Sequence, residues 1–207
     1  MSKYIALTFD DGPSNVTSKV LDILEGYGIP GTFFLIGDNI GSPARDEARA
    51  LMTRQISLRC ELCNHSLTHS HMPTLSAKSI ADEISTTTAR IKDVTGTTPA
   101  FFRPPFIDVN DDMYDTIDLP FICGVDSIDW DSNTSVQQRI DNIMAGARDG
   151  AIILMHDFTD NNKTVEALPT VIDNLREQGY RFVTVSELFR VKGVDPNVKG
   201  KIWSYVE

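Results

Sequence analysis

Strand-forming and helix-forming segments alternate along the whole chain, and this alternation limits the folds open to it. Parallel strands are joined by right-handed helical crossovers, so a regular alternation predicts an α/β fold with a parallel sheet. The seven predicted strands could close, imperfectly, into a barrel. The apolar segments that predict strands begin near Tyr4, Gly31, Ser57, Ala100, Pro120, Ala151 and Arg181, and helical patterns cover 15–27, 43–54, 76–94, 109–117, 134–147, 163–178 and 186–191.

Length and charge set limits on the organisation of the chain and on its partners. A chain of 207 residues is expected to form one domain over residues 1–207, with a substantial core. Its net charge of −10 argues against nucleic acid and against an anionic membrane surface. No stretch approaches the roughly 18 apolar residues of a transmembrane helix. We expect a monomer with neither nucleic acid nor membrane as a partner.

Two adjacent carboxylates, Asp10 and Asp11, lie where the first predicted strand runs into Gly12 and Pro13. Successive side chains of a strand point to opposite faces, so a bend at Gly12-Pro13 would be needed to bring both to one site. Two close carboxylates repel unless a cation or a shared proton relieves them. The pair therefore suggests one aspartate bound to metal and its neighbour free to act as a base. Taken alone, the motif is more typical of a simple turn.

Three of the four histidines fall between positions 65 and 71. His65 and His69 are spaced i, i+4, and a single helical turn would place both imidazoles on one face. Two imidazoles and one carboxylate leave coordination positions open, as a catalytic metal site requires. These ligands suit Zn²⁺ and also Co²⁺, Ni²⁺ or Fe²⁺, so the ligand type does not identify the metal.

Five motifs make the chain similar to the polysaccharide deacetylases (carbohydrate esterase family four, the NodB-homology domain). They occur in the family's order and span nearly the whole chain. The resemblance implies a distorted (β/α) barrel with an incomplete wall of about seven parallel strands and with functional residues at the carboxyl ends of the strands. The motifs are Thr8-Phe9-Asp10-Asp11-Gly12-Pro13, His65-Ser66-Leu67-Thr68-His69, Arg103-Pro104-Pro105-Phe106, Asp126-Ser127-Ile128-Asp129-Trp130 and Leu154-Met155-His156.

The resemblance assigns a metal site and a catalytic base. Asp11, His65 and His69 match the family's metal ligands, which implies one divalent ion, with Zn²⁺ and Co²⁺ favoured. Such an ion polarises the acetyl carbonyl and lowers the pKa of the attacking water. Asp10 matches the base that takes a proton from this water, and Arg103 matches the arginine that pairs with the base and keeps it ionised.

The remaining motif residues match groups that act on the leaving group and on the acetyl group. His156 matches the general acid, and Asp129 the carboxylate that orients and charges this histidine. The backbone N–H of Phe106 matches a donor to the oxyanion, and Trp130 and Leu154 match residues that line the acetyl pocket. His71 has no counterpart in the motifs, and we expect it to pack within its loop.

Two segments depart from the family's pattern. Many members have Gly-His-Glu-(Ile or Leu)-Gly-Asn before the first metal histidine, where this chain has 59–64 (RCELCN), a change expected to alter packing around the ligands and not the ligands themselves. Many members also have Tyr-Gly where this chain has Phe106-Ile107, so a hydroxyl that could contact sugar is lost.

Cys60 and Cys63 have C-x-x-C spacing. We expect two buried, reduced thiols on opposite faces of a strand over 57–63.

The segments 64–72, 148–157 and 179–193 look most similar to the acetylxylan esterases of this family. The expected activity is therefore hydrolysis of O-acetyl groups on acetylxylan, an acetylated polysaccharide or oligosaccharide substrate. The alternative is N-deacetylation of N-acetylglucosamine in chitin oligomers or peptidoglycan. The intact Asp10 argues against a third interpretation, an inactive carbohydrate-binding module.

Family members usually act outside the cytoplasm, so a secreted module of a longer protein is expected. Met1-Ser2-Lys3 carries no signal peptide, which leaves a cytoplasmic location open.

Overall fold

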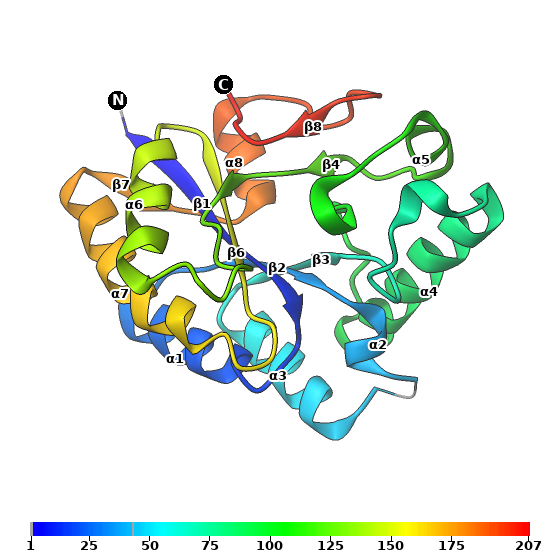
Figure 1. Ribbon diagram of the computed structural model, residues 1–207, viewed down its shortest axis with the longest axis horizontal. Helices are drawn as coiled ribbons and strands as arrows, with labels where there is room; N and C mark the ends of the chain where they lie inside the picture. Colours follow the sequence, from blue (N-terminus) through cyan, green and yellow to red (C-terminus); the bar gives the residue numbers. More distant parts are fainter. Residues whose placement is uncertain (1, 43) are drawn as a thin grey trace.

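Strands and helices alternate from one end of the chain to the other in the computed structural model, which describes residues 2–42 and 44–207 (Figure 1). The strands are β1 (Lys3–Gly12), β2 (Thr32–Leu35), β3 (Glu61–Asn64), β4 (Phe121–Ile122), β5 (Val125–Asp126), β6 (Ala151–His156), β7 (Tyr180–Phe182) and β8 (Ile202–Trp203). The helices are α1 (Thr17–Tyr27), α2 (Gly37–Ile40), α3 (Asp46–Ser57), α4 (Ala77–Thr95), α5 (Asp111–Thr116), α6 (Val136–Gly146), α7 (Asn162–Glu177) and α8 (Val185–Lys192), with 3₁₀ turns η1 (Met72–Thr74) and η2 (Pro105–Ile107).

The long strand β1 is the centre of a six-stranded sheet. β6 pairs with one of its edges over Ile5–Asp10. The other edge is shared, because β7 lies beside Lys3–Ile5 and β2 beside Thr8–Gly12. β3 extends the sheet beyond β2, and β5 extends it beyond β6. All of these pairings are parallel, which confirms the predicted α/β class.

Short connections continue the sheet into a distorted barrel that does not close. Phe102 bridges Asn64 at the end of β3 to Phe121 in β4, and β4 pairs with β8. The chain after β8 then reaches the start of β6, where the N–H of Ile152 donates to the carbonyl of Ser204 over 3.0 Å. This C-terminal segment crosses the top of Figure 1. Within residues 2–42 and 44–207, only isolated bridges and single hydrogen bonds join the two-stranded β4-β8 sheet to the six-stranded one, so the wall is incomplete, as the family resemblance implied.

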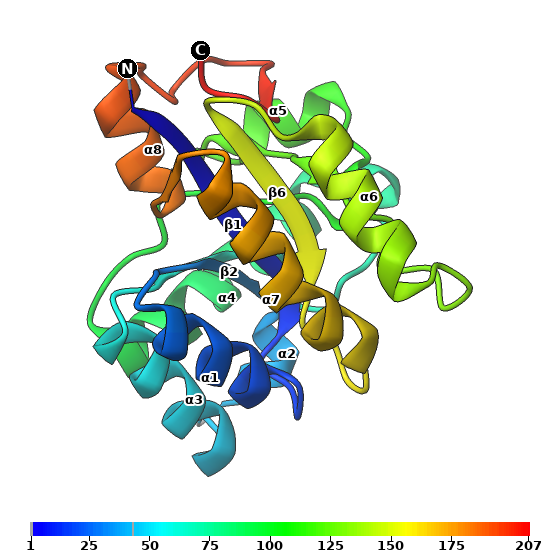
Figure 2. The same cartoon turned by 90° about the vertical axis from the view of Figure 1, so that its left-hand side faces the viewer.

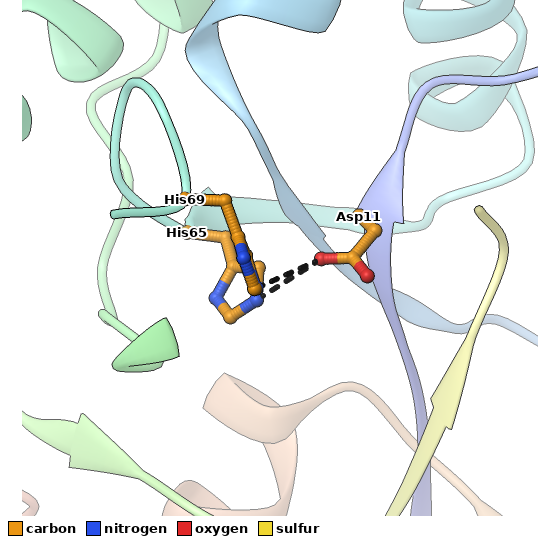
Figure 3. Close-up of side chains that lie close together, drawn as sticks. All are labelled: Asp11, His65 and His69. Carbon is orange, nitrogen blue, oxygen red and sulfur yellow. Dashed lines mark ion pairs between the residues drawn. The ribbon is translucent and has the colours of Figure 1, made fainter. Parts of the chain in front are cut away.

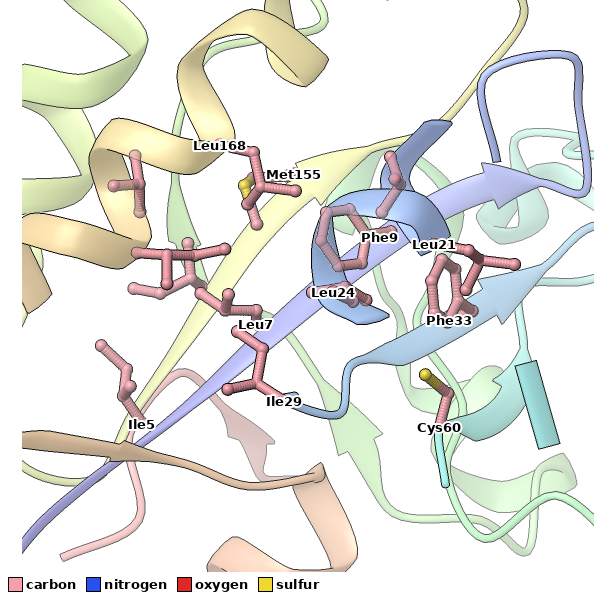
Figure 4. Close-up of a cluster of buried hydrophobic side chains, with 14 of the residues drawn as sticks. Ile5, Leu7, Phe9, Leu21, Leu24, Ile29, Phe33, Cys60, Met155 and Leu168 are labelled. Carbon is pink, nitrogen blue, oxygen red and sulfur yellow. The ribbon is translucent and has the colours of Figure 1, made fainter. Parts of the chain in front are cut away.

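The two faces of β1 serve different purposes. Ile5, Leu7 and Phe9 point outward into a buried cluster with the apolar faces of α1 and α7 (Figure 4). Burial of each such side chain stabilises the fold by about 1.5–3 kcal/mol. Figure 2 shows α6 and α7 alongside β6 and β1. The alternate residues Thr8 and Asp10 point into the barrel, where they meet buried polar groups at the functional site.

Several element boundaries differ from the predicted ones. Ser57, the predicted start of a strand, is the last residue of α3, because the helix continues to bury Met52 and Gln55 at helical spacing; β3 begins at Glu61. The helix predicted over 43–54 starts at residue 43, which lies outside the described residues. The predicted strand near Ala100 is reduced to the bridged Phe102. None of the described helices combines the length and the apolar character needed to cross a membrane.

Cys60 and Cys63 are buried free thiols, as predicted. Cys60 packs into the cluster outside the sheet and Cys63 into the one inside the barrel, so the two side chains lie on opposite faces. Burial raises the pKa of the Cys60 thiol to about 11 and that of Cys63 well above its ordinary value. Both cysteines therefore act as small apolar residues of the core.

Candidate metal and catalytic site

A β-bulge brings Asp10 and Asp11 to one site. Asp10 aligns with Phe34 and Gly12 with Leu35, so Asp11 is an extra residue in β1. Asp11 has a left-handed φ of 73°, which aspartate tolerates better than most residues. The bend that we predicted at Gly12-Pro13 therefore lies one residue earlier. As a result both carboxylates approach His65 Nε2, Asp11 Oδ1 at 3.3 Å and Asp10 Oδ2 at 3.8 Å.

Position 12 requires a glycine because the side chain of Asp157, just after β6, lies too close to leave room for a Cβ. A Cβ at this position would lie 2.5 Å from Oδ2 of Asp157, the residue after His156. Asp157 is fully buried, its Oδ2 accepts from the hydroxyl of Thr17 at 2.5 Å, and its backbone N–H donates to the carbonyl of Asp10 at 2.9 Å. Burial raises the pKa of Asp157 to about 7. Asp157 thus ties the end of β6 to the aspartate pair of β1.

His65 and His69 lie on a loop, so the predicted helical turn is wrong. Residues 65–71 have no helical assignment, and Ser66 and His69 have left-handed φ values of 66° and 57°. The serine hydroxyl accepts from the N–H of His69 at 3.0 Å and helps to fold the loop back. The i, i+4 spacing nonetheless brings both rings together, with centroids 5.0 Å apart.

A buried carboxylate from α4 holds this loop. Glu83 Oε2 accepts from the backbone N–H groups of Leu67 and Thr68, at 2.7 and 2.9 Å. Its Oε1 accepts from the hydroxyl of Thr68 at 2.7 Å. Charge-assisted hydrogen bonds of this kind are about twice as strong as neutral ones. Glu83 therefore replaces the helical hydrogen bonds that the sequence led us to expect.

Asp11, His65 and His69 together form a set of ligand atoms that fits a metal ion (Figure 3). Asp11 Oδ1 lies 3.3 Å from His65 Nε2 and 3.5 Å from His69 Nε2. The Nδ1–H of His65 donates to the carbonyl of Arg103 at 2.7 Å, so Nε2 is the nitrogen that faces Asp11 and would offer its lone pair to a metal ion in place of a proton. Asp11 Oδ1 is buried and has no hydrogen-bond donor among the described residues. These atoms suit a divalent cation with positions left open.

The charges around these atoms also suit a cation. Burial raises the pKa of Asp11, but the close approach and charge of His65 outweigh it and lower the value to about 2. Burial, followed by the charge of His65, lowers the pKa of His69, which keeps that ring neutral. An ionised carboxylate and a neutral imidazole are the forms that bind metal.

Asp10 is paired with a buried arginine. Arg103 Nη1 donates to Asp10 Oδ1 at 2.6 Å and to the hydroxyl of Thr8 at 2.7 Å. Its Nη2 donates to the carbonyl of Cys123, and its guanidinium lies 4.1 Å from the ring centre of Phe34. Neither Arg103 nor Asp10 is more than 1% exposed, so each charge depends on the other for compensation.

His156 and Asp129 form a second buried pair on the opposite side of the site. The Nδ1–H of His156 donates to Asp129 Oδ1 at 2.6 Å, which leaves Nε2 as the nitrogen able to give up a proton. Burial lowers the pKa of His156, but the hydrogen bond and charge of Asp129, aided by Asp10 and Asp11, raise it to about 9. The imidazole is therefore protonated at neutral pH.

A pocket of about 530 Å³ joins the metal ligands, Asp10 and His156. Leu154 forms part of its buried wall, whereas Phe106 and Trp130 are 65% and 59% exposed and lie at its mouth. The indole N–H of Trp130 donates to Asp126 Oδ2 at 3.2 Å. The pocket lining is Asp10, Asp11, His65, His69, Pro104, Phe106, Ile107, Cys123, Asp126, Trp130, Leu154 and His156.

All ten residues predicted for the site are thus brought together. Arg103 and Asp129 lie behind the pocket and reach it through Asp10 and His156. His71 lies outside the pocket, where its Nε2 is 2.6 Å from Asp108 Oδ2 in a half-exposed pair. This position agrees with the predicted role in loop packing.

The sequence is similar to those of known polysaccharide deacetylases. The family model for polysaccharide deacetylase matches residues 1–119. A bifunctional xylanase/deacetylase of Pseudobutyrivibrio xylanivorans is 52% identical over 205 residues, which cover 99% of this chain and 33% of that protein. A peptidoglycan-N-acetylglucosamine deacetylase of Listeria monocytogenes is 37% identical over 194 residues, which cover 92% of this chain and 40% of that protein. The chain therefore spans between a third and two fifths of these curated relatives.

Two solved structures superimpose over nearly all of the chain. One is the Xyl-CE4 domain of a multidomain xylanase from the hindgut metagenome of Trinervitermes trinervoides, with 53% identity, a TM-score of 0.96 and coverage of 100% of this chain and 98% of the other. The other is a family 4 acetyl xylan esterase from Clostridium thermocellum in complex with a cobalt ion, with 39% identity, a TM-score of 0.92 and coverage of 99% of both chains.

Proposed function

The chain belongs to the polysaccharide deacetylase family, and we propose that it hydrolyses O-acetyl groups on xylan with the help of one divalent metal ion, Zn²⁺ or Co²⁺. The observation that carries this proposal is that one pocket holds a carboxylate outside the ligand set, Asp10, together with a complete set of metal-binding atoms and a charged imidazole. A binding module needs none of these groups together. The two structural relatives named for xylan support the choice of substrate.

Asp10 is the general base of the proposed reaction. Arg103 engages its Oδ1, so Oδ2 is left to accept the proton of the attacking water. The guanidinium charge compensates the charge of the buried carboxylate and fixes its orientation. A positioned base of this kind contributes about 10²–10⁴ to the rate.

Asp11, His65 and His69 are the residues that would hold the metal ion. When bound, such an ion supplies Lewis acidity to the acetyl carbonyl and lowers the pKa of the attacking water. The backbone N–H of Phe106 at the mouth of the pocket is the protein's own donor to the developing oxyanion. Its residue has a left-handed φ of 59°, a conformation in which the chain turns sharply beside His69.

His156 is the general acid. Its Nε2 proton goes to the sugar oxygen as the acetyl carbon–oxygen bond breaks, and Asp129 holds the ring and its charge throughout. Leu154 provides an apolar wall for the acetyl methyl group, while Trp130 and Phe106 offer exposed aromatic faces to the sugar ring. Together these groups supply the base, the acid and the binding surface of an ester hydrolysis.

N-deacetylation of N-acetylglucosamine is the second candidate, because the Listeria relative carries that activity in its name. A charged His156 could also protonate an amine. Acetate release from acetylxylan, chitin oligomers and peptidoglycan, measured side by side, separates the two activities. We expect release from acetylxylan to be the fastest, and Asp10→Asn is the control for release that does not depend on this site. Faster release from either N-acetylated polymer would contradict the proposed substrate.

A further inference from the structure

A buried arginine lies behind the general acid and has no part in the mechanism above. Arg139 of α6 is only 2% exposed, and no carboxylate lies within ion-pair distance of it in the described part of the chain. Its guanidinium instead donates to neutral oxygens: Nε to the carbonyl of Thr134 at 3.2 Å, and Nη1 to Asn161 Oδ1 at 2.6 Å and Thr164 Oγ1 at 2.8 Å. A buried arginine without a carboxylate partner is uncommon and costly, so its surroundings deserve a functional explanation.

The two side chains that accept hydrogen bonds from Arg139 in turn donate hydrogen bonds to Asp129. The hydroxyl of Thr164 donates to Asp129 Oδ2 at 2.6 Å. The amide of Asn161 donates to the same oxygen at 3.2 Å and to the carbonyl of His156 at 3.0 Å. Two hydrogen-bond paths, one through Thr164 and one through Asn161, therefore connect Arg139 to Asp129, each with a single residue between them.

Arg139 fixes the direction of both routes. A guanidinium has donors and no acceptor, so the Thr164 oxygen that receives its N–H must turn its own proton elsewhere, toward Asp129. For the same reason the carbonyl end of the Asn161 amide faces Arg139 and the NH₂ end faces Asp129. A neutral residue at position 139 would allow either group to rotate.

Asp129 is held in one orientation as a consequence. Its Oδ2 accepts from Thr164, from Asn161 and from the backbone N–H of His156, the last at 2.9 Å. Its Oδ1 is left for the imidazole Nδ1–H. The plane of the carboxylate, and with it the direction in which the ring presents Nε2 to the pocket, is fixed by donors on one side.

We propose that Arg139 is a positioning residue for the general acid: through Thr164 and Asn161 it orients Asp129 so that His156 presents its proton to the leaving oxygen. This inference rests on the proposed role of His156. A purely structural role, in which Arg139 only joins α6 to the start of α7, is the competing explanation. The two differ in what they predict for leaving groups, because a phenolate leaves readily without a proton and a sugar alkoxide does not.

The experiment compares kcat on an acetylated xylo-oligosaccharide with kcat on 4-nitrophenyl acetate for Arg139→Met, Arg139→Lys and Thr164→Val. Thr164→Val removes one route and leaves the arginine in place, so it tests the proposal even if Arg139→Met does not fold. We expect Arg139→Met and Thr164→Val to lower kcat on the sugar ester about tenfold, part of the range for loss of a general acid. Aryl ester hydrolysis should fall less than about twofold, and Arg139→Lys should recover part of the loss.

Thr87→Val is the matched control, because Thr87 is equally buried and its hydroxyl has no hydrogen-bond partner among the described residues. It should leave the ratio of the two activities unchanged. His156→Ala, combined with Thr164→Val, should behave like His156→Ala alone, since the two changes act on one group.

Measuring His156→Ala separates the possible failures. Suppose that His156→Ala spares aryl ester hydrolysis, but that Arg139→Met and Thr164→Val lower the activity on both substrates equally, or that the effect of Thr164→Val adds fully to that of His156→Ala. Arg139 is then structural, and this inference fails while the proposed function stands. If His156→Ala itself lowers every substrate by one factor, the role of His156 as the acid fails, and this inference fails with it.

Discussion

The charge on Asp129 should set the upper pH limit of activity, and Asp129→Asn tests this. The pair is almost fully buried, with side-chain exposures of 13% for His156 and 1% for Asp129. Asp129 is the main cause that raises the pKa of His156 from 6.5 to about 9, a difference of about 3 kcal/mol in favour of the charged ring. Burial opposes this rise, so removing the carboxylate charge should return the pKa to its ordinary value or lower it further.

The size of the effect follows from the fraction of His156 that is protonated. The acid must carry its proton, so activity falls as the pH rises through its pKa. At pH 8 about 90% of a histidine of pKa 9 is protonated, but only about 3% of one of pKa 6.5, which gives about a thirtyfold loss. At pH 5.5 both forms are almost fully protonated, and this part of the loss disappears.

The assay is kcat/KM on soluble acetylxylan between pH 5 and pH 10, with 4-nitrophenyl acetate as the substrate that needs no proton on its leaving group. We expect the alkaline limb for acetylxylan to move down by about 2.5 pH units or more in Asp129→Asn. Any loss that comes from altered geometry should be the same at every pH. A variant that loses activity by one constant factor across the range would refute the electrostatic account of His156.

Three further substitutions test other parts of the site. Asp10→Asn should keep the metal bound, as measured by metal content, while kcat falls by about 10²–10⁴; loss of the ion would make Asp10 a ligand. Gly12→Ala should lower the melting temperature, because its Cβ would lie 2.5 Å from Asp157, whereas Gly26→Ala, with no atom within 4 Å, is the control that should not. Glu83→Gln weakens the hydrogen bonds that hold the histidine loop, so metal affinity, measured by calorimetric titration, should fall about 10–100-fold. Unchanged affinity would show that the loop keeps its conformation without the Glu83 carboxylate.

The sequence predicted which residues meet at the site because parallel strands bring their carboxyl ends to one edge. Asp10 and His156 are aligned residues of β1 and β6, and His65 follows β3. Five ordered motifs, each following a predicted strand, therefore located the pocket. The strands β5 and β8 were not predicted, because two residues are too few for an apolar pattern.

What the sequence missed depends on contacts between distant segments. The loop that holds His65 and His69 was predicted as a helical turn, because the carboxylate that stabilises it, Glu83, lies 14 or more positions away on another element. The groups behind Asp129 are scattered over α6 and α7 and form no motif. The exposure of Trp130 was also not predicted, since it depends on how distant segments pack around the mouth of the pocket.

The most direct test of the whole account is acetate release from acetylxylan by protein stripped of metal and then reloaded. Chelation followed by removal of the chelator should abolish release, and one equivalent of Zn²⁺ or Co²⁺ should restore it. A variant with His65 and His69 both changed to alanine should bind no ion and stay inactive after reloading. Full acetate release by the metal-free protein, or restored release by the double variant, would contradict the assignment of Asp11, His65 and His69 as the metal site of this enzyme.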